Sequence, residues 1–244
     1  MFTPVTEATA PALSVVVPAF NEARRLPPTL RAIDAYFRAA PHRGELIVVD
    51  DGSTDETSDL VGALAREGLQ VRLIRHEANQ GKGAAVRTGV MAASGDVVLF
   101  TDADLSTPIE DVERLLAAIR EGADVAIGSR AIDRSLVMVH QPWLRDRMGR
   151  VFNVFVQVVL LPGLKDTQCG FKAFRGGTAQ ELFGATQTDG FEFDTEVLYR
   201  ARRRGLVTRE IPVHWRDSPD TRVNALLDSP RMLLGLFRIR RLVR

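Results

Sequence analysis

Cysteine is almost absent from the sequence, since Cys169 is the single cysteine among 244 residues. One thiol excludes an internal disulfide and fits a reducing compartment. A catalytic cysteine needs a base beside it, and the sequence places none of the four histidines to serve as one. We therefore expect Cys169 to be a packing residue.

Long hydrophobic runs are missing as well. The longest nearly apolar stretch, residues 151–164, is interrupted by Asn153 and Gln157. It is shorter than the roughly 20 residues that a membrane-spanning helix needs. The N-terminal stretch also lacks the basic, apolar and cleavage-site regions of a signal peptide. We expect a cytoplasmic protein that does not cross a membrane.

Aromatic residues are few, at 7%, and the net charge is only +1. The charge is unevenly spread: residues 200–244 hold twelve Arg against four Asp and Glu, a balance of +8, which leaves −7 for residues 1–199. The basic tail indicates an anionic surface or substrate. Because aromatics are scarce and the rest of the chain is acidic, nucleic acid is not the expected partner.

Short runs rich in Val, Ile and Leu alternate with helical patterns through the first half of the chain. The runs are 13–18, 45–50, 71–75, 96–101 and 124–127, and the helical patterns are 24–38, 55–66, 82–93 and 109–121. This alternation predicts an α/β fold with a Rossmann-like, mostly parallel sheet, whose ligands bind outside the carboxyl ends of the strands. Beyond residue 130 helices dominate, at 145–161, 177–183, 194–204 and 225–243, with strand-like pieces at 171–174 and 207–213.

Two carboxylates follow the fourth apolar run, in the segment Asp102-Ala103-Asp104. Acidic groups at the end of a buried strand are costly unless a cation compensates them. Mg²⁺ prefers hard oxygen ligands and usually takes one or two carboxylates together with phosphate oxygens. The pattern therefore favours a site for Mg²⁺ or Mn²⁺ on Asp102 and Asp104. The alternative is an ordinary turn and helix cap before Pro108.

Two other strand ends carry candidate ligand-binding residues. Asp50 and Asp51 close the second run, where a carboxylate can accept a hydrogen bond from a nucleobase or ribose, or cap the next helix. Gly81 and Lys82 open the third helical pattern, but the Walker A phosphate-loop pattern is absent. The glycine either lets a ligand approach the backbone closely or makes a tight turn.

Charged residues beyond the fifth run are further candidates. Arg130 follows that run, and its guanidinium can bind a phosphate through two N–H groups. Asp166 and Lys172 flank a glycine turn. Glu192 and Asp194 precede a helical pattern, where negative charge also favours a helix N-terminus.

Six segments occur in an order that resembles family-two glycosyltransferases of the GT-A fold. They are Val17-Pro18-Ala19-Phe20-Asn21-Glu22, Val49-Asp50-Asp51-Gly52-Ser53, Asn79-Gln80-Gly81-Lys82-Gly83, Asp102-Ala103-Asp104, Gly128-Ser129-Arg130 and Asp166-Thr167-Gln168-Cys169-Gly170-Phe171-Lys172. The first four mark the general transferase. The last resembles the polyprenyl-phosphate sugar synthases, and among them the dolichyl-phosphate β-glucosyltransferases.

The resemblance covers about Ser14 to Arg240 and implies one GT-A domain with a helical C-terminal portion. Within it we expect an N-terminal tail at 1–12, a nucleotide-sugar-binding half at 13–130, an acceptor-binding half at 131–222 and a basic amphipathic helix at 223–244. Ser106 stands where mannosyl-lipid synthases tend to have a glutamine as a further metal ligand. A UDP-sugar, either UDP-glucose or UDP-N-acetylhexosamine, is therefore favoured over GDP-mannose.

Site residues are implied position by position. Pro18, Phe20 and Glu22 would line the nucleoside pocket, and Asp51, supported by Asp50, would contact the base. The full set implied for donor binding is Pro18, Phe20, Glu22, Asp50, Asp51, Gly81, Lys82, Asp102, Ala103 and Asp104. The set implied for catalysis is Asp104, Arg130, Asp166, Lys172 and Asp194.

The implied reaction is an inverting, metal-dependent transfer of a hexose from a nucleotide-diphosphate donor to polyprenyl phosphate. A phosphate monoester has its second pKa at about 6, so such an acceptor needs no strong base. A hydroxyl acceptor would need one, with Asp166, Asp194 or Glu192 as candidates. Two alternatives stay open: a family-two transferase with a soluble or glycan hydroxyl acceptor, and a non-catalytic nucleotide-sugar-binding protein. Retention of both Asp102 and Asp104 argues against the second.

Two segments favour a membrane surface as a partner. In 145–161 a narrow polar stripe leaves a wide apolar surface, which either packs in the core or lies in the membrane interface. The stripe is Asp146, Arg150, Asn153 and Gln157. In 226–244 one helix face is apolar and another basic, which suits an anionic leaflet or, again, core packing. The two faces are Met232, Leu236, Ile239 and Val243, and Arg231, Arg238, Arg241 and Arg244.

The expected partners follow from these segments and from the resemblance. They are a nucleotide-diphosphate sugar, polyprenyl phosphate and a membrane surface. A small membrane protein that helps to recruit the lipid is left as an open alternative. We expect the protein to lie peripherally on the cytoplasmic face of a membrane.

Overall fold

The computed structural model describes residues 12–40, 42–139, 143–217 and 225–243. In the helices that follow the last two gaps, side chains are described from residues 147 and 234 onward. Asp146, Arg231, Met232 and Arg244, which belong to the predicted amphipathic segments, therefore lie outside the described side chains.

The centre of the fold is a seven-stranded sheet in the order β3-β2-β1-β4-β7-β5-β8. Every neighbouring pair is parallel except the two that involve β7. The strands are β1 (Leu13–Ala19), β2 (Gly44–Asp50), β3 (Arg72–Arg75), β4 (Val97–Thr101), β5 (Val125–Ser129), β7 (Phe171–Arg175) and β8 (Thr208–Pro212). A separate two-stranded sheet pairs β6 (Val137–Val139) with β9 (Trp215–Arg216).

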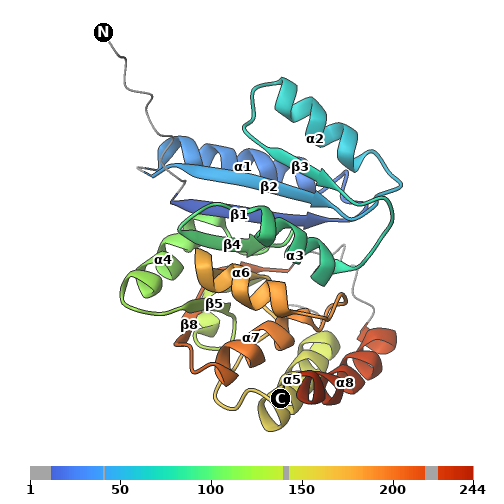
Figure 1. The fold of residues 1–244 in the computed structure, drawn as a ribbon, viewed down its shortest axis with the longest axis vertical. Coiled ribbons are helices and arrows are strands. Elements are labelled where there is room, and N and C mark those ends of the chain that lie inside the picture. The colour runs from blue at the N-terminus through green and yellow to red at the C-terminus, as the bar shows by residue number, and fades with distance from the viewer. Residues whose placement is uncertain (1–11, 41, 140–142, 218–224, 244) are drawn as a thin grey trace.

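Helices cover both faces of the sheet (Figure 1). The helices are α1 (Leu26–Ala39), α2 (Thr57–Arg66), α3 (Lys82–Ala92), α4 (Val112–Arg120), α5 (Trp143–Val159), α6 (Gly176–Ala185), α7 (Phe193–Arg203) and α8 (Ala225–Leu242). Short 3₁₀ turns, η1 (Ile109–Asp111) and η2 (Arg134–Leu136), precede α4 and β6. The central strands are buried along their whole length and rich in apolar residues, because both of their sides are covered.

Two hydrophobic cores result, one on each face. The first joins the sheet to α1, α2 and α4, and the second joins it to α3, α6 and α7. Phe100, Phe174, Phe183 and Phe193 pack against one another at the centre of the second core. Helices α5 and α8 pack side by side and close this second core. Single buried faces on α1 and α4 follow from their amphipathic sequences.

The antiparallel strand β7 determines what surrounds the carboxyl edge of the sheet. Its first residue, Phe171, pairs with Thr101 at the end of β4. The amino end of β7 therefore lies at the same edge as the carboxyl ends of the parallel strands. Residues 166–170, which precede β7, are brought beside the segments that follow β4 and β5.

The predicted α/β class and the mostly parallel sheet are confirmed, and each predicted strand and helix overlaps an observed one. Strands β6 and β9 were not predicted, because two or three residues are too short to show an alternating pattern. Among the helices that the structure describes, none combines the length and hydropathy required to span a bilayer.

Candidate active site

Asp102 and Asp104 lie at the carboxyl edge, directly after β4. Their side chains are 36% and 19% exposed, so both carboxylates reach solvent. The Asp102 N–H donates to the Gly170 carbonyl at 3.1 Å, and a Cβ added to Gly170 would lie 2.0 Å from Oδ2 of Asp102. Gly170 thus leaves the space that the Asp102 carboxylate occupies. The intervening Ala103 is buried, and its carbonyl accepts from Thr29 at 2.7 Å.

Asp104 is held by its neighbours. Its Oδ1 accepts from the Ser106 N–H at 3.1 Å and from the Ser106 hydroxyl at 3.0 Å. Arg25 Nη1 lies 3.6 Å from Oδ2 of Asp104, while Arg25 Nε donates to Glu22 at 2.7 Å. Arg25 therefore joins Glu22, which follows β1, to the segment that follows β4.

Lys82 provides the nearest positive charge to Asp102. It is the first residue of α3, and its Nζ lies 2.6 Å from Oδ1 of Asp102 and 6.0 Å from the centre of the Phe193 ring. Burial favours the neutral amine, but the carboxylates of Asp102 and Asp194 outweigh it and raise the pKa of Lys82. The residue stays cationic at this edge of the sheet.

Gly81 sets the position of Lys82 through its backbone. Its φ of 106° is unfavourable for residues with a side chain, and a Cβ there would lie 2.3 Å from the Asp189 carbonyl. The Gly83 N–H donates to the same carbonyl at 2.7 Å. A Cβ added to Gly83 would lie 2.5 Å from the Thr188 carbonyl, so close backbone packing accounts for the glycines on either side of Lys82.

Asp50 and Asp51 are buried and hold loops together. Asp51 accepts from the Gln80 and Gly81 N–H groups at 3.0 and 2.8 Å, and His76 Nδ1 lies 2.7 Å from its Oδ1. Asp50 accepts from the Ser53 N–H at 2.8 Å. These bonds fix the strand ends of β2 and β3 against the start of α3. A contact of Asp51 with a nucleobase stays a prediction.

Arg130 and Asp166 form an ion pair with two parallel hydrogen bonds, at 2.7 and 2.8 Å. The Arg130 N–H also donates to Asp166 at 3.0 Å, and the guanidinium lies 5.3 Å from the centre of the Trp215 ring. Glu210 accepts from the Asp166 N–H at 2.8 Å. Burial alone would raise the pKa of Asp166, but the Arg130 guanidinium more than offsets it and lowers this pKa to about 2. Asp166 is therefore a weak base.

Replacing Asp166 by asparagine is expected to lower the free energy of unfolding at neutral pH by about 3 kcal/mol, because the charge of Arg130 loses its partner. The carboxyl has a folded-state pKa of about 2 against an ordinary value of 3.8. Its stabilisation is thus complete above the unfolded pKa and is lost as the pH falls through the folded one. The difference in free energy of unfolding between wild type and variant, measured by urea titration, should shrink as the pH is lowered from about 5 to about 2. A difference that is constant over this range would contradict the pairing. Asp59→Asn, on the exposed face of α2, is the control.

Lys172 and Asp194 form a second pair, deep in the protein. Their side chains are 1% and 5% exposed, and Lys172 Nζ lies 2.7 Å from Asp194 Oδ1 and donates to the Cys169 carbonyl at 2.6 Å. Burial raises the pKa of Asp194 in spite of the two nearby lysines, Lys172 and Lys82. The pair anchors residues 169–170 beneath Asp102. Direct contact of Lys172 with a substrate stays a prediction, as does that of Asp194.

The remaining predicted residues occupy the positions expected of strand ends. Pro18 is buried in β1, and Phe20, just beyond β1, is 37% exposed. Cys169 is buried, and desolvation raises the pKa of its thiol to about 12. Its packing role is confirmed, because a thiol that holds its proton this strongly is a poor nucleophile.

Arg25, His76 and Glu210 were missed by the sequence reasoning. Arg25 carried a signal, since it lies three residues after Glu22, a spacing at which opposite charges can pair in the turn before α1. His76 directly follows β3 and so shares the strand-end position of the residues that were identified. Glu210 carried no local signal, because its partner Asp166 is 44 residues away in the chain.

The donor set at this edge fits a hard divalent cation. Asp102 and Asp104 offer carboxylate oxygens, and the described residues contain no group of three or more His, Cys, Asp or Glu arranged to hold a metal by themselves. Such a two-carboxylate site is what Mg²⁺ uses when a substrate's phosphates complete its ligands. The Ser106 hydroxyl is already bonded to Asp104. Lys82, Arg25 and Arg130 add positive charge around the two carboxylates.

Comparisons with known proteins agree with this geometry. A model of glycosyl transferase family 2 matches residues 14–183. The dolichyl-phosphate beta-glucosyltransferase of Dictyostelium discoideum is 33% identical, with 93% of this chain and 73% of that protein covered. The enzyme of the same name from Saccharomyces cerevisiae is 34% identical, with 93% and 74% covered.

A solved structure shares the fold. The glucosyl-3-phosphoglycerate synthase of Mycobacterium tuberculosis, crystallised with Mn²⁺ and UDP-glucose, superposes with a TM-score of 0.68 at 20% identity, covering 94% of this chain and 79% of that one. The predicted resemblance and the predicted GT-A fold are confirmed. This chain belongs to glycosyl transferase family 2.

Proposed function

We propose that the protein moves a hexose from a nucleotide-diphosphate donor to polyprenyl phosphate with inversion, using Mg²⁺ or Mn²⁺. One observation carries the proposal: Asp102 and Asp104 lie at the carboxyl edge of the sheet, surrounded by Lys82, Arg25 and Arg130. The relatives that match most of the chain are named dolichyl-phosphate beta-glucosyltransferases, which favours UDP-glucose as donor and a polyprenyl phosphate as acceptor.

The chemistry requires charge stabilisation more than proton transfer. The bond between the anomeric carbon and the diphosphate oxygen breaks while an acceptor phosphate oxygen forms a bond to the opposite face of that carbon. Asp102 and Asp104 would hold the ion, which when bound offsets the charge that develops on the leaving diphosphate. Lys82, fixed by Gly81 and paired with Asp102, supplies further preorganised positive charge at the same edge.

The charged residues near this edge suit a phosphate acceptor. A phosphate monoester is already ionised at neutral pH and needs no general base. Asp166 is unsuited to be one, because its pKa is lowered to about 2 and both of its oxygens face Arg130. Asp194 is bonded to Lys172 in the interior. Two of the three candidate bases are thus paired with cations, which favours an acceptor that needs no base.

The decisive test is a panel of nucleotide sugars incubated with polyprenyl phosphate in detergent and with Mg²⁺ or Mn²⁺. We expect label from UDP-glucose to become extractable as a glycolipid, and excess EDTA to abolish this product. Transfer to a soluble or glycan hydroxyl acceptor, with none to polyprenyl phosphate, would assign the protein to the alternative transferase class. Absence of product from every donor and acceptor would refute the proposed activity. Asp59→Ala is a suitable control, because Asp59 lies on an exposed face of α2.

A lipid acceptor also implies contact with a membrane surface. We propose that the protein lies peripherally on this surface. The acceptor phosphate would reach the carboxyl edge of the sheet from that surface.

A further inference from the structure

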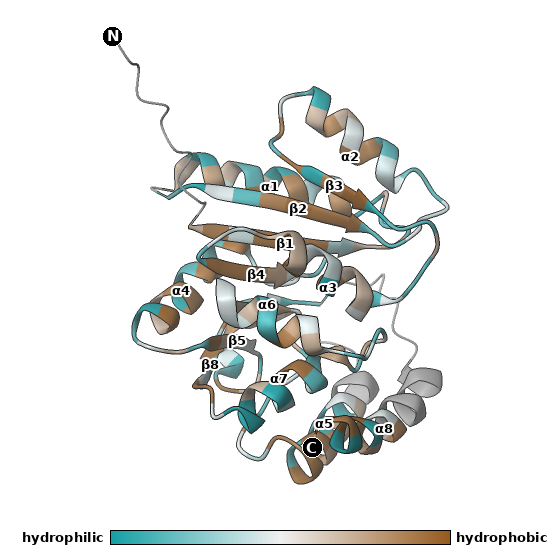
Figure 2. Ribbon diagram, in the orientation of Figure 1, coloured by the Kyte–Doolittle hydropathy of each residue, from teal (hydrophilic) through white to brown (hydrophobic). Residues whose placement is uncertain are grey.

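Helices α5 and α8 mix apolar and polar residues along the parts that are coloured in Figure 2. Their apolar side chains lie both on the surface and in the core. Phe152 and Val156 of α5 and Leu236 and Ile239 of α8 are buried in the second core. The same helices also carry large apolar side chains that are exposed on the surface. These are Val151, Val154, Phe155 and Val158 on α5, and Leu234 and Phe237 on α8. Val158 is 80% exposed and Leu234 is 72% exposed, which is unusual for residues of this kind outside an interaction surface.

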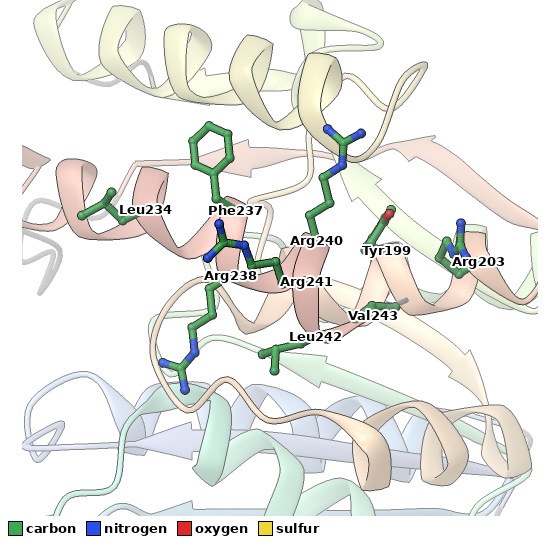
Figure 3. Close-up of a pocket in the computed structure, with 9 residues that line it drawn as sticks. All are labelled: Tyr199, Arg203, Leu234, Phe237, Arg238, Arg240, Arg241, Leu242 and Val243. Carbon is green, nitrogen blue, oxygen red and sulfur yellow. The ribbon is translucent and has the colours of Figure 1, made fainter.

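An arginine-rich groove lies between α7 and α8, and two of these apolar side chains, Leu234 and Phe237, form part of its wall. Figure 3 shows Tyr199 and Arg203 of α7 on one side and Arg238, Arg240 and Arg241 of α8 on the other. Among the described residues, none forms an ion pair with any of the four guanidinium groups. Leu234, Phe237, Leu242 and Val243 complete the lining. The groove therefore combines unpaired positive charge with an apolar wall.

We propose that this surface docks on a bilayer that contains anionic phospholipids, with the arginines binding headgroup phosphates and the exposed apolar side chains entering the interface. We name it the α5–α8 face and define it by Val154, Val158, Leu234, Phe237 and the four groove arginines. Guanidinium groups bind phosphate oxygens with paired hydrogen bonds, and an interfacial helix inserts its apolar side chains among the headgroups and acyl chains.

The charge of the face argues against other occupants. A second copy of this chain, docked symmetrically, would bring the same arginines against one another. A nucleic acid would satisfy the arginines but leave Val158 and Leu234 in water. An anionic membrane satisfies both kinds of side chain at once.

The position of α8 connects the face to the active site. A Cβ added to Gly235 of α8 would lie 3.1 Å from Cγ of Glu192, so the helix backbone packs closely on that residue. Glu192 lies next to Phe193, whose ring faces Lys82. Docking would therefore place the bilayer beside the carboxyl edge. The inference rests on the proposed function only for this consequence, since binding to lipid is tested without any sugar donor.

The test is co-sedimentation of the full chain with vesicles of phosphatidylcholine alone and of phosphatidylcholine mixed with phosphatidylglycerol. Wild type should bind the mixed vesicles more tightly, and added salt should weaken this binding. The variant R238Q/R240Q/R241Q should bind them about a hundredfold more weakly, because each arginine near an anionic surface contributes about 1 kcal/mol, or about fivefold. R31Q/R38Q/R66Q removes the same charge from exposed positions on α1 and α2, at the other end of the sheet, and should bind as wild type does.

A second variant tests the apolar part of the face. L234S/F237S should reduce binding to both kinds of vesicle, and its circular dichroism should match that of wild type. The inference would be overturned if R238Q/R240Q/R241Q and R31Q/R38Q/R66Q lost vesicle binding equally. It would also be overturned if wild type showed no preference for anionic vesicles. Transfer of sugar to a short-chain, water-soluble isoprenyl phosphate should be unchanged in R238Q/R240Q/R241Q. Vesicle binding without transfer to any acceptor would leave the docking face standing and reject the proposed activity.

Discussion

Replacing Asp104 by alanine is expected to lower the rate of sugar transfer by about a thousandfold. A metal ion contributes several kcal/mol to stabilising charge in a transition state, and each 1.36 kcal/mol is a factor of ten in rate. The substitution removes one of the two carboxylates that fit the ion and also leaves Arg25 without one of its partners. Initial rates with UDP-glucose and polyprenyl phosphate, at saturating Mg²⁺ and Mn²⁺, measure the effect.

A separate readout distinguishes loss of the ion site from loss of the fold. Binding of Mn²⁺ in the presence of UDP, followed by electron paramagnetic resonance, should be weakened in Asp104→Ala and unchanged in Asp59→Ala. Thermal unfolding of Asp104→Ala should stay close to that of wild type, since the Asp104 side chain is partly exposed. Full activity in Asp104→Ala, or activity that persists in excess chelator, would reject the metal-assisted mechanism.

Adding a single methyl group at Gly170 is expected to cost about a hundredfold in transfer rate. The new Cβ would lie 2.0 Å from Oδ2 of Asp102, so the carboxylate must move. A displacement of about 1 Å in a catalytic arrangement can cost 10²-fold. Because the Asp102 side chain is partly exposed, it can rotate away, and the fold should survive. Measuring the transfer rate and the thermal unfolding of Gly170→Ala together distinguishes displacement of the Asp102 carboxylate from loss of the fold.

Gly62→Ala is the matched control for this substitution. Gly62 lies in α2, and a Cβ added there would meet nothing within 4 Å. Alanine in place of a helical glycine should stabilise the protein by about 1 kcal/mol and leave transfer unchanged. If Gly170→Ala transfers sugar at the wild-type rate, the Asp102 carboxylate does not need its present position, and its role as a metal ligand falls.

The repeating first half of the fold could be predicted because each strand there is covered on both sides. A strand such as β1, with every residue buried, appears in the sequence as a nearly continuous apolar run, and the next helix shows its own period. The parallel direction of β1, β2 and β4 follows from that alternation. The direction of β7 does not, because the segment 171–175 has the same apolar character in either orientation. Its reversal is decided by pairing with Thr101 and Val125 on two different strands.

In the candidate site, the positions of residues could be predicted, whereas their contacts could not. Asp50, Asp51, Asp102 and Asp104 could be identified because a strand end fixes where a residue lies. What their side chains contact depends on the loops that approach them. The sequence could not show that Asp51 is bonded to backbone groups 29 and 30 residues further along the chain. Nor could it show that Asp166 is paired to Arg130 and would serve poorly as a base, since the pairing spans 36 residues.

The place of β7 between β4 and β5 has a consequence for building chimaeras of related transferases. Strand β5 ends at Ser129, and its neighbours in the sheet, β7 and β8, both come from beyond residue 170. A crossover between two homologues at residue 130 would therefore set β5 of one parent against both flanking strands of the other. A chimaera with its crossover after β4 should fold better, because β5, β7 and β8 then come from the same parent. Such a chimaera has a single foreign strand pairing in this sheet, between β4 and β7.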